Sequence, residues 1–198
     1  RKALGQFEIT QDPFSGSSNS FAAGNGSIMR LAPIPMFYTQ RPELAIMKSA
    51  ESSRTTHGAI EAIDACRYLG AIIVGALNGA PKDELLSEHY CPITDYWKKN
   101  PLTSKIDDIA MGSFRHKEPP DIKGTGYVVE SLEAALWAFN KAETFDEGCL
   151  LAVNLGDDAD TTGAIYGQIA GAYFGEQGIP QKWLRNLAMR PTILNLAH

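Results

Sequence analysis

An acidic loop near the carboxyl end of the chain, residues 154–163, carries the residue types best suited to chemistry. Its sequence is NLGDDADTTG, so three carboxylates and two hydroxyls fall between Asp157 and Thr162. An apolar run, 149–153, leads into the loop, and apolar residues recur with helical spacing over 164–173. The acids therefore crowd the N-terminus of a helix, where negative charge is favourable. Three acids exceed the needs of one cap, and oxygen donors of this kind suit a hard cation such as magnesium or calcium.

Three interpretations of this loop follow from the residues alone. Asp158 or Asp160 could simply cap the helix, as Asp often does. A calcium loop would have an acidic ligand at its fifth place and a bidentate Glu at its twelfth, but Thr162 and Ile169 stand there, so this interpretation fails. A phosphotransferase motif with Asp158 as nucleophile would need a whole α/β domain after it, and only residues 164–198 follow.

Composition indicates one soluble globular domain over residues 1–198. The chain has 198 residues, of which 44% are hydrophobic and 21% charged, which suffices for a sizeable single core. The net charge of −5 and the lack of a Lys/Arg stripe argue against binding to a nucleic-acid backbone. The sequence leaves the oligomeric state open.

Cysteine usage and hydropathy favour a cytoplasmic protein. Cys66, Cys91 and Cys149 are odd in number and form no C-x-x-C pair, so neither a disulfide framework nor a zinc site is indicated. No apolar run reaches the ~18 residues of a membrane span, and no secretory leader is recognisable. We therefore expect a reducing compartment and no membrane partner.

Two glycine turns are candidates for ligand binding. Gly24-Asn25-Gly26-Ser27 frees the backbone for positive φ and for close approach to a ligand, as in phosphate or sugar cradles, although a plain turn is the simpler alternative. Gly124-Thr125-Gly126-Tyr127 is a second turn of this type.

The remaining pattern predicts an all-α fold, because no alternation of period two extends over a useful length. Expected helices cover Leu4 to Phe7, Pro42 to about Ser53, Ala59 to Leu77, Pro81 to Glu88, Ile106 to Met111, Val128 to Phe139, and Thr144 to about Val153 with a capping box, followed by the helix after the acidic loop. The 59–77 helix is apolar all round, which indicates a central core helix. The chain opens at Arg1 without a methionine, inside an apparent amphipathic helix, so we expect a fragment.

The last long helix has glycine at every fourth position, namely Gly163, Gly167, Gly171 and Gly175. One face of this helix therefore lacks side chains, and we expect another helix to pack closely against it.

Four segments, in the same order, resemble the ADP-ribosylglycohydrolase family. They are AAGNGSIMRLAP from Ala22, SSRTTHG from Ser52, GTGYVVESLEAALWAF from Gly124, and GDDADTTGAIYGQIAGAYFG in the acidic motif from Asn154. With the helices between them they cover nearly the whole chain. The resemblance implies a compact all-helical fold with a binuclear magnesium site at the base of a cleft that holds ADP-ribose or an ADP-ribosylated protein.

The resemblance also implies roles for individual residues. The metal ligands would be Asp158, Asp160 and Thr161, and the two acids would also be catalytic. Backbone amides around the diphosphate would come from Ala22, Ala23, Gly24, Asn25, Gly26 and Ser27, with His57 beside them, and the adenosine end would be held by Gly124, Gly126 and Tyr127. A helix cap remains the alternative for His57, and a core aromatic the alternative for Tyr127.

Glycosidic cleavage explains why such residues would be needed. The bond at an anomeric carbon breaks through an oxocarbenium-like state, which requires a positioned water, a carboxylate to manage its proton, and a fixed ribose. Magnesium held by carboxylates would act as template and Lewis acid. We expect Asp158 and Asp160 to face the same cleft as the 24–27 loop.

The chain departs from the family pattern in two places. Asp157 stands where the family often has Gly, and its role as a cap or supporting acid is open. In the family an amino-terminal segment supplies a Glu and a Thr-Asp-Asp run to the metals, and we expect the chain that begins at Arg1 to lack it. The chain is thus expected to be a hydrolase that needs that segment for activity, or an ADP-ribose-binding or regulatory module without catalysis.

Overall fold

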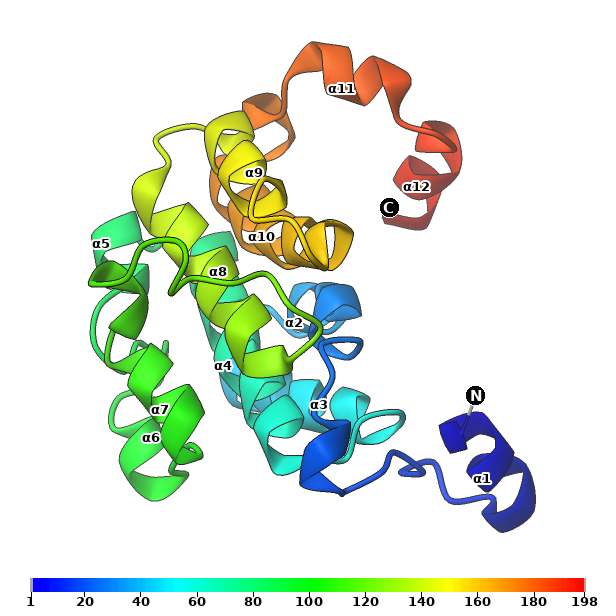
Figure 1. Ribbon diagram of the computed structural model, residues 1–198. Coiled ribbons are helices and arrows are strands. Elements are labelled where there is room, and N and C mark those ends of the chain that lie inside the picture. The colour runs from blue at the N-terminus through cyan, green and yellow to red at the C-terminus, as the bar shows by residue number, and fades with distance from the viewer. Residues whose placement is uncertain (1, 198) are drawn as a thin grey trace.

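The computed structural model describes residues 2–197, and helices joined by loops make up this part of the chain (Figure 1). Within it there is no β-strand, and two isolated β-bridges, Ser17 with His57 and Gly24 with Tyr127, are the only extended pairings. The predicted all-α fold is confirmed. Arg1, where the expected first helix opens, lies outside the described residues.

Helices of very different length follow one another along the chain. The α-helices are α1 (Lys2–Thr10), α2 (Pro33–Phe37), α3 (Pro42–Arg54), α4 (Ile60–Leu77), α5 (Lys82–Leu85), α6 (Tyr96–Lys99), α7 (Ser104–Ala110), α8 (Val128–Lys141), α9 (Phe145–Val153), α10 (Ala159–Phe174), α11 (Gln181–Asn186) and α12 (Arg190–Ala197). The short 3-10 turns are η1 (Ser20–Ala22), η2 (Ile28–Arg30), η3 (Ser113–Arg115) and η4 (Glu176–Gly178).

Helix α4 lies at the centre of the fold, as its apolar sequence predicts. Both Leu69 and Ile72 on it are fully buried, and α2, α3, α7, α8 and α10 contact it from different sides. Gly70 makes the contact with α3 possible, because a Cβ there would come within 2.5 Å of the Ser49 hydroxyl. This core helix fixes the positions of the loops at both of its ends.

The expected helix bounds agree with the structure where the apolar period is strong. Helices α3, α4, α8 and α9 begin and end within about two residues of the predicted positions. Thr144 caps α9 by accepting from the Glu147 amide, while the Glu147 carboxylate accepts from the amide of Glu143. The region 90–120, which shows little periodicity, holds the short helices α6 and α7, and α5 is shorter than expected.

The glycine face of α10 is only partly covered. A Cβ on Gly163 would lie 2.8 Å from Val153 of α9, so close helix packing is confirmed at this position. At Gly167 and Gly171 the expectation is wrong, because nothing lies within 4 Å of a Cβ there. These two glycines line an apolar groove of about 320 Å³ together with Met36 of α2 and with Ile73 and Leu77 of α4.

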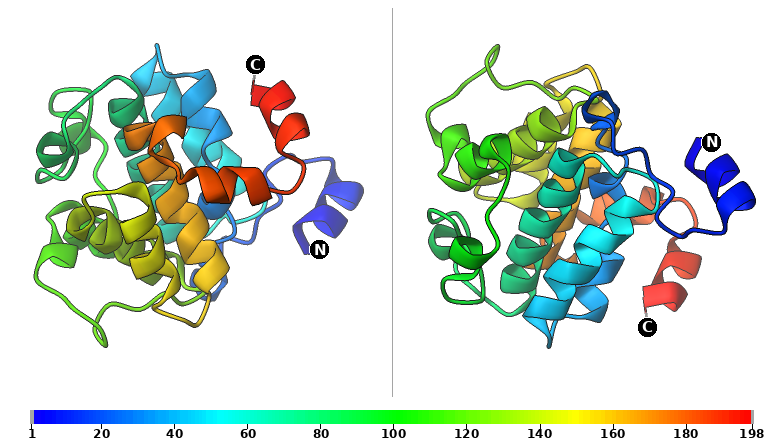
Figure 2. Two further views of the ribbon diagram at one scale, coloured as in Figure 1. Left: turned by 90° about the horizontal axis from the view of Figure 1, so that it is seen from above. Right: turned by 90° about the horizontal axis from the view of Figure 1, so that it is seen from below.

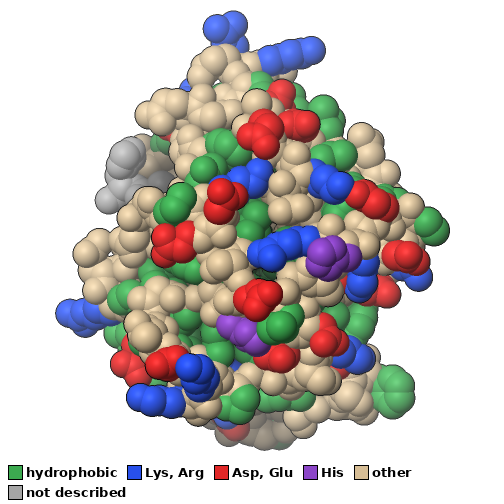
Figure 3. Space-filling model, turned by 90° about the vertical axis from the view of Figure 1, so that its left-hand side faces the viewer, with side chains coloured by type: hydrophobic (Ala, Val, Ile, Leu, Met, Phe, Trp, Pro, Cys, Tyr) green, Lys and Arg blue, Asp and Glu red, His purple; other side chains and the backbone are tan. Residues whose placement is uncertain are grey.

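The two terminal helices stand apart from the main helical body. In the views of Figures 1 and 2, α1 and α12 extend on the same side of the molecule. The face over α5, α6 and α7 carries acidic and basic side chains interspersed, as Figure 3 shows. Cys66, Cys91 and Cys149 are all free thiols. No helix within residues 2–197 combines the length and apolar character needed to cross a lipid bilayer.

Candidate active site

The acidic loop and the first glycine turn meet through a side-chain hydrogen bond. Asn25 Nδ2 donates to Asp158 Oδ2 at 2.7 Å, although the two residues lie 133 positions apart. Asn25 is buried, and its side-chain Nδ2 also lies within hydrogen-bonding distance of Ser131 Oγ and Thr125 O. The structure therefore places Asp158 beside the 24–27 loop, as predicted, while a shared cleft with Asp160 stays a prediction.

The second glycine turn joins these two loops through the backbone. The backbone amide of Asn25 donates to Gly126 O at 3.1 Å, and that of Val128 donates to Ala23 O at 3.0 Å. The same glycine turn binds the acidic loop, because the backbone amide of Asp158 donates to Gly124 O at 2.8 Å. Three segments that are distant in the sequence thus form one cluster.

The amides of the 22–27 segment are not equally available to a ligand. Those of Ala22 and Ala23 donate within the segment, to Asn19 O and Ser20 O. Within the described residues no acceptor is bonded to the amides of Gly24, Gly26 or Ser27. These three donors remain for an anionic ligand such as a diphosphate.

His57 lies directly against the glycine turn. A Cβ on Gly26 would be 2.8 Å from His57 Cε1, so only glycine allows the ring to occupy this position. The backbone of His57 forms a bridge with Ser17, and its Nδ1 lies 2.8 Å from the Thr56 hydroxyl. The ring therefore does not cap a helix. Burial, with a smaller effect from the charge of Arg30, lowers the pKa of His57 below its usual value.

The acidic residues begin α10 in different environments. Asp158 occupies the N-cap position, but its side chain bonds to Asn25 and makes no capping hydrogen bond, so the simple cap interpretation is wrong for Asp158. Asp160 is exposed in the first turn, while Thr161 is buried with its hydroxyl 3.7 Å from Met29 Sδ. Asp157 is exposed and has a left-handed φ of 55°, a conformation that Gly or Asp tolerates better than other residues. This conformation explains why glycine is an alternative at position 157.

The oxygen donors at the start of α10 fit a hard cation in type, since carboxylates and a hydroxyl are ligands that magnesium accepts. Asp158 has one carboxylate oxygen beyond the one bonded to Asn25. Among residues 2–197, no three His, Cys, Asp or Glu side chains converge as a complete cation site. The chain thus offers a partial donor set.

Tyr127 belongs to a polar cluster that sequence reasoning did not find. Its hydroxyl donates to Glu61 Oε2 at 2.6 Å and accepts from Lys105 Nζ at 2.7 Å. Its ring packs partly on the core, as the core alternative predicts, and partly lines an open hollow of about 480 Å³ shared with Phe21 and Gly24. Glu61 could have been noticed as an acid four residues after His57, in the first turn of a mainly apolar helix. No motif or spacing in the sequence around Lys105 indicated that it belongs to this cluster.

Comparison with known proteins identifies the family to which this chain belongs. The ADP-ribosylglycohydrolase family model matches residues 1–198, and the chain belongs to this family. It is 36% identical over 197 residues to the ADP-ribosylarginine hydrolase Tri1 of Serratia proteamaculans, covering 100% of this chain and 51% of that protein. It is 29% identical over 168 residues to the ADP-ribosyl-[dinitrogen reductase] glycohydrolase of Rhodospirillum rubrum, covering 85% of this chain and 52% of that one.

A solved structure supports the same assignment. A chain of an "ADP-ribosylglycohydrolase-related protein complex" is similar to the whole of this chain, with a TM-score of 0.88 and 43% identity, and 65% of that chain is covered. The present chain spans about half the length of the two curated relatives named above.

Proposed function

We propose that this chain forms the ADP-ribose-binding part, and part of the catalytic centre, of a magnesium-dependent hydrolase that cleaves the glycosidic bond of ADP-ribosylated protein side chains or small ADP-ribose conjugates. The contact between Asn25 and Asp158 is the observation that carries this proposal. It brings the amides that we propose for anion binding and the Asp158 carboxylate that we propose as catalytic into one cluster, as a substrate with a diphosphate next to a reacting ribose would require.

The diphosphate end of the substrate is proposed to lie over the first glycine turn. The amides of Gly24, Gly26 and Ser27, which have no acceptor among the described residues, provide donors, and the His57 ring borders them. The hollow beside Tyr127 and Glu61 is open enough to hold the adenosine end. Ala22 and Ala23 contribute through the shape of the turn, because their amides are engaged within the segment.

The reacting ribose is proposed to lie at the start of α10. Asp158, fixed by Asn25, and the exposed Asp160 would orient the attacking water and accept its proton while positive charge develops on the anomeric carbon. With Thr161 they offer oxygen ligands for magnesium, which when bound supplies a Lewis acid and a template for hydroxyls and water.

Arginine is the acceptor that we propose first. Two curated relatives, from Serratia proteamaculans and Pseudomonas putida, are ADP-ribosylarginine hydrolases, with 36% and 39% identity to this chain. Free thiols at Cys66, Cys91 and Cys149 are compatible with a reducing compartment, and we propose the cytoplasm.

A second function is an ADP-ribose-binding or regulatory module without catalysis. The partial donor set favours it, since residues 2–197 do not form a complete cation site from His, Cys, Asp and Glu. Such a module would keep the glycine turns and His57 and would bind ADP-ribose without hydrolysing its conjugates.

Hydrolysis of ADP-ribosylarginine by residues 1–198 together with the amino-terminal segment expected to complete the metal site, measured with and without magnesium, tests the first proposal. We expect magnesium-dependent release of ADP-ribose that falls at least tenfold on changing Asp158→Asn or Asp160→Asn. Asp83→Asn, at an exposed position on α5, is the matched control and should leave the rate unchanged. Binding of ADP-ribose without any hydrolysis would favour the binding module, and absence of both would contradict both proposals.

A further inference from the structure

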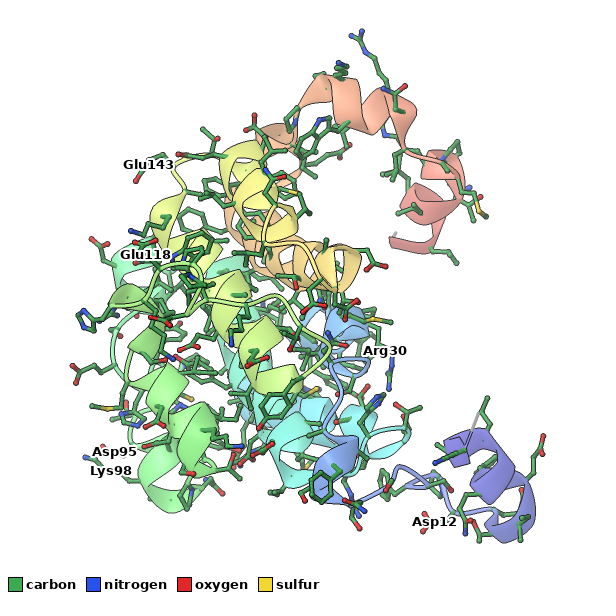
Figure 4. All side chains as sticks on the ribbon, in the orientation of Figure 1. Asp12, Arg30, Asp95, Lys98, Glu118 and Glu143 are labelled. Atoms are coloured by element: carbon green, nitrogen blue, oxygen red, sulfur yellow. The ribbon has the colours of Figure 1, made fainter. Side chains whose placement is uncertain are left out.

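Arg30, labelled in Figure 4, lies on η2, and its guanidinium donates to three hydroxyls at the end of α3, those of Ser52, Thr55 and Thr56. Its Nη2 donates to Thr56 Oγ1 at 2.8 Å and to Ser52 O at 3.2 Å, while Nη1 donates to Ser52 Oγ at 3.2 Å. A guanidinium has donors only, so the Thr56 hydroxyl must accept from it.

The same hydroxyl lies 2.8 Å from His57 Nδ1. A hydroxyl has a single proton, and among the described residues its only partners are the Arg30 donor and this ring nitrogen. The oxygen could accept a second N–H, but it already accepts from a cationic guanidinium, which disfavours a further donor there. Donation of the Thr56 proton to Nδ1 is therefore favoured, with Nδ1 as the acceptor. In a neutral imidazole the ring proton then resides on Nε2.

The ring nitrogen Nε2 is the one that faces the glycine turn. It lies 3.0 Å from the position that a Cβ on Gly26 would take, and 3.6 Å from the corresponding position on Gly24. The backbone around the ring is held on both sides, since the Ser53 hydroxyl donates to His57 O and the amide of Gly58 donates to Ser17 O. The fold thus orients the ring so that the edge carrying Nε2 lies toward the glycine turn.

Burial and a neighbouring positive charge favour the neutral form of the His57 ring. Burial and the nearby Arg30 guanidinium lower the pKa of His57. A guanidinium bonded to the Thr56 oxygen also polarises the hydroxyl, which strengthens its donation to Nδ1.

We propose that Arg30 is a positioning residue that acts through Thr56 to hold His57 in the Nε2–H tautomer, so that this N–H points at the Gly24–Gly26 turn as a fourth anion donor. The inference rests on the proposed function for the identity of the anion, a diphosphate oxygen. The Arg30–Thr56–His57 relay itself is a property of the free protein.

Nitrogen-15 spectra of the histidine rings test the relay without any ligand. At pH 7.5 the wild-type His57 signal, identified by its loss in His57→Gln, should show a protonated Nε2 and an unprotonated Nδ1. Thr56→Val and Arg30→Met should convert it to a mixture of tautomers, and Thr56→Ser should restore the wild-type pattern. Thr55→Val is the matched control, because the Thr55 hydroxyl also accepts from Arg30 Nη2, at 3.4 Å, and donates to Ser52 O, but does not contact His57.

Binding of ADP-ribose tests the consequence of the relay. Thr56→Val should weaken binding about threefold to tenfold, the range expected for one hydrogen bond. In a His57→Gln background Thr56→Val should have no further effect, because a Gln amide presents an N–H that has no tautomer.

Three results would overturn the relay: a wild-type His57 with its proton on Nδ1, a tautomer pattern that Thr56→Val does not change, or an equal loss of binding in the His57→Gln background. If the wild-type chain binds no ADP-ribose, the proposed function fails, but the ring spectra still decide the relay.

Discussion

The carboxylate of Asp158 accepts a hydrogen bond of 2.7 Å from the buried side-chain amide of Asn25. This contact connects the N-terminus of α10 to the turn before η2 and closes a loop of 133 positions. The amide leaves one Asp158 oxygen for other ligands. Asn25 therefore helps to fix the geometry of the acidic loop, together with the bond from the Asp158 backbone amide to Gly124 O.

Changing Asn25→Asp should destabilise the fold in a pH-dependent way. Two carboxylates would then meet at the same place, and their repulsion would raise the pKa of one of them above its unfolded value of about 3.9. The folded form would bind more protons than the unfolded form, so stability should fall as pH rises through about 4 and above. Urea denaturation at pH 7.5 should show a loss of about 2–3 kcal/mol relative to wild type, with a smaller loss at pH 4.

Asn186→Asp is the control for this change, because Asn186 is exposed on α11 and its amide bonds only within that helix. An equal loss in both variants, or a loss from Asn25→Asp that does not vary with pH, would contradict the close contact with Asp158.

The lowered pKa of His57 predicts a loss of stability at mildly acidic pH. Burial disfavours the charged ring in the folded protein, while the unfolded ring binds a proton near pH 6.5. Stability from the neutral ring is thus present above about pH 6.5 and is lost as pH falls toward the folded pKa, by at most about 1.4 kcal/mol per pH unit. His57→Gln should flatten the dependence of the urea midpoint on pH between 7.5 and 5. The exposed His116→Gln controls for removal of an imidazole and should keep the wild-type slope.

Two glycines of α10 should respond in opposite ways to alanine. Gly167→Ala adds a Cβ to open space in the middle of a helix and should stabilise the chain by about 0.5–1 kcal/mol. Gly163→Ala places a Cβ 2.8 Å from Val153 and should destabilise it by about 1–3 kcal/mol. Each variant serves as the control for the other in urea denaturation, and effects of the same sign would contradict the difference in packing.

The central helix and the meeting of the acidic loop with the first glycine turn were predictable from sequence patterns. The apolar period of 59–77 is strong enough to predict a buried α4, and Asp158 and the 24–27 turn were expected together through the family resemblance. Glycine spacing alone could not distinguish Gly163, which α9 covers, from Gly167, which faces a groove, because that depends on where neighbouring helices end.

Contacts between polar side chains of different elements were not predictable. Lys105 reaches Tyr127 from α7, whose segment shows little periodicity, and Arg30 reaches Thr56 only because η2 and the end of α3 come together in the fold. Such contacts depend on tertiary placement and leave no spacing in the sequence.

Asp157 should be replaceable by glycine without loss of stability. Its φ of 55° costs an ordinary side chain about 1–2 kcal/mol, a cost that glycine avoids. Asp157→Gly should therefore be at least as stable as wild type in urea denaturation, and Asp157→Ala less stable by about 1 kcal/mol. At the exposed Asp108 within helix α7 the order should reverse, with alanine more stable than glycine. Alanine more stable than glycine at position 157 would contradict the left-handed conformation.

Magnesium binding by this chain should be weak and should depend on the acids at the start of α10. Asp158, Asp160 and Thr161 supply few ligands, and magnesium retains water where protein ligands are few. Calorimetric titration of residues 1–198 should give weak binding, and Asp158→Asn and Asp160→Asn should each reduce the affinity further. Asp83→Asn, exposed on α5, should have no effect. Tight binding that survives both Asn substitutions would place the cation elsewhere and would remove the acidic loop from the metal site.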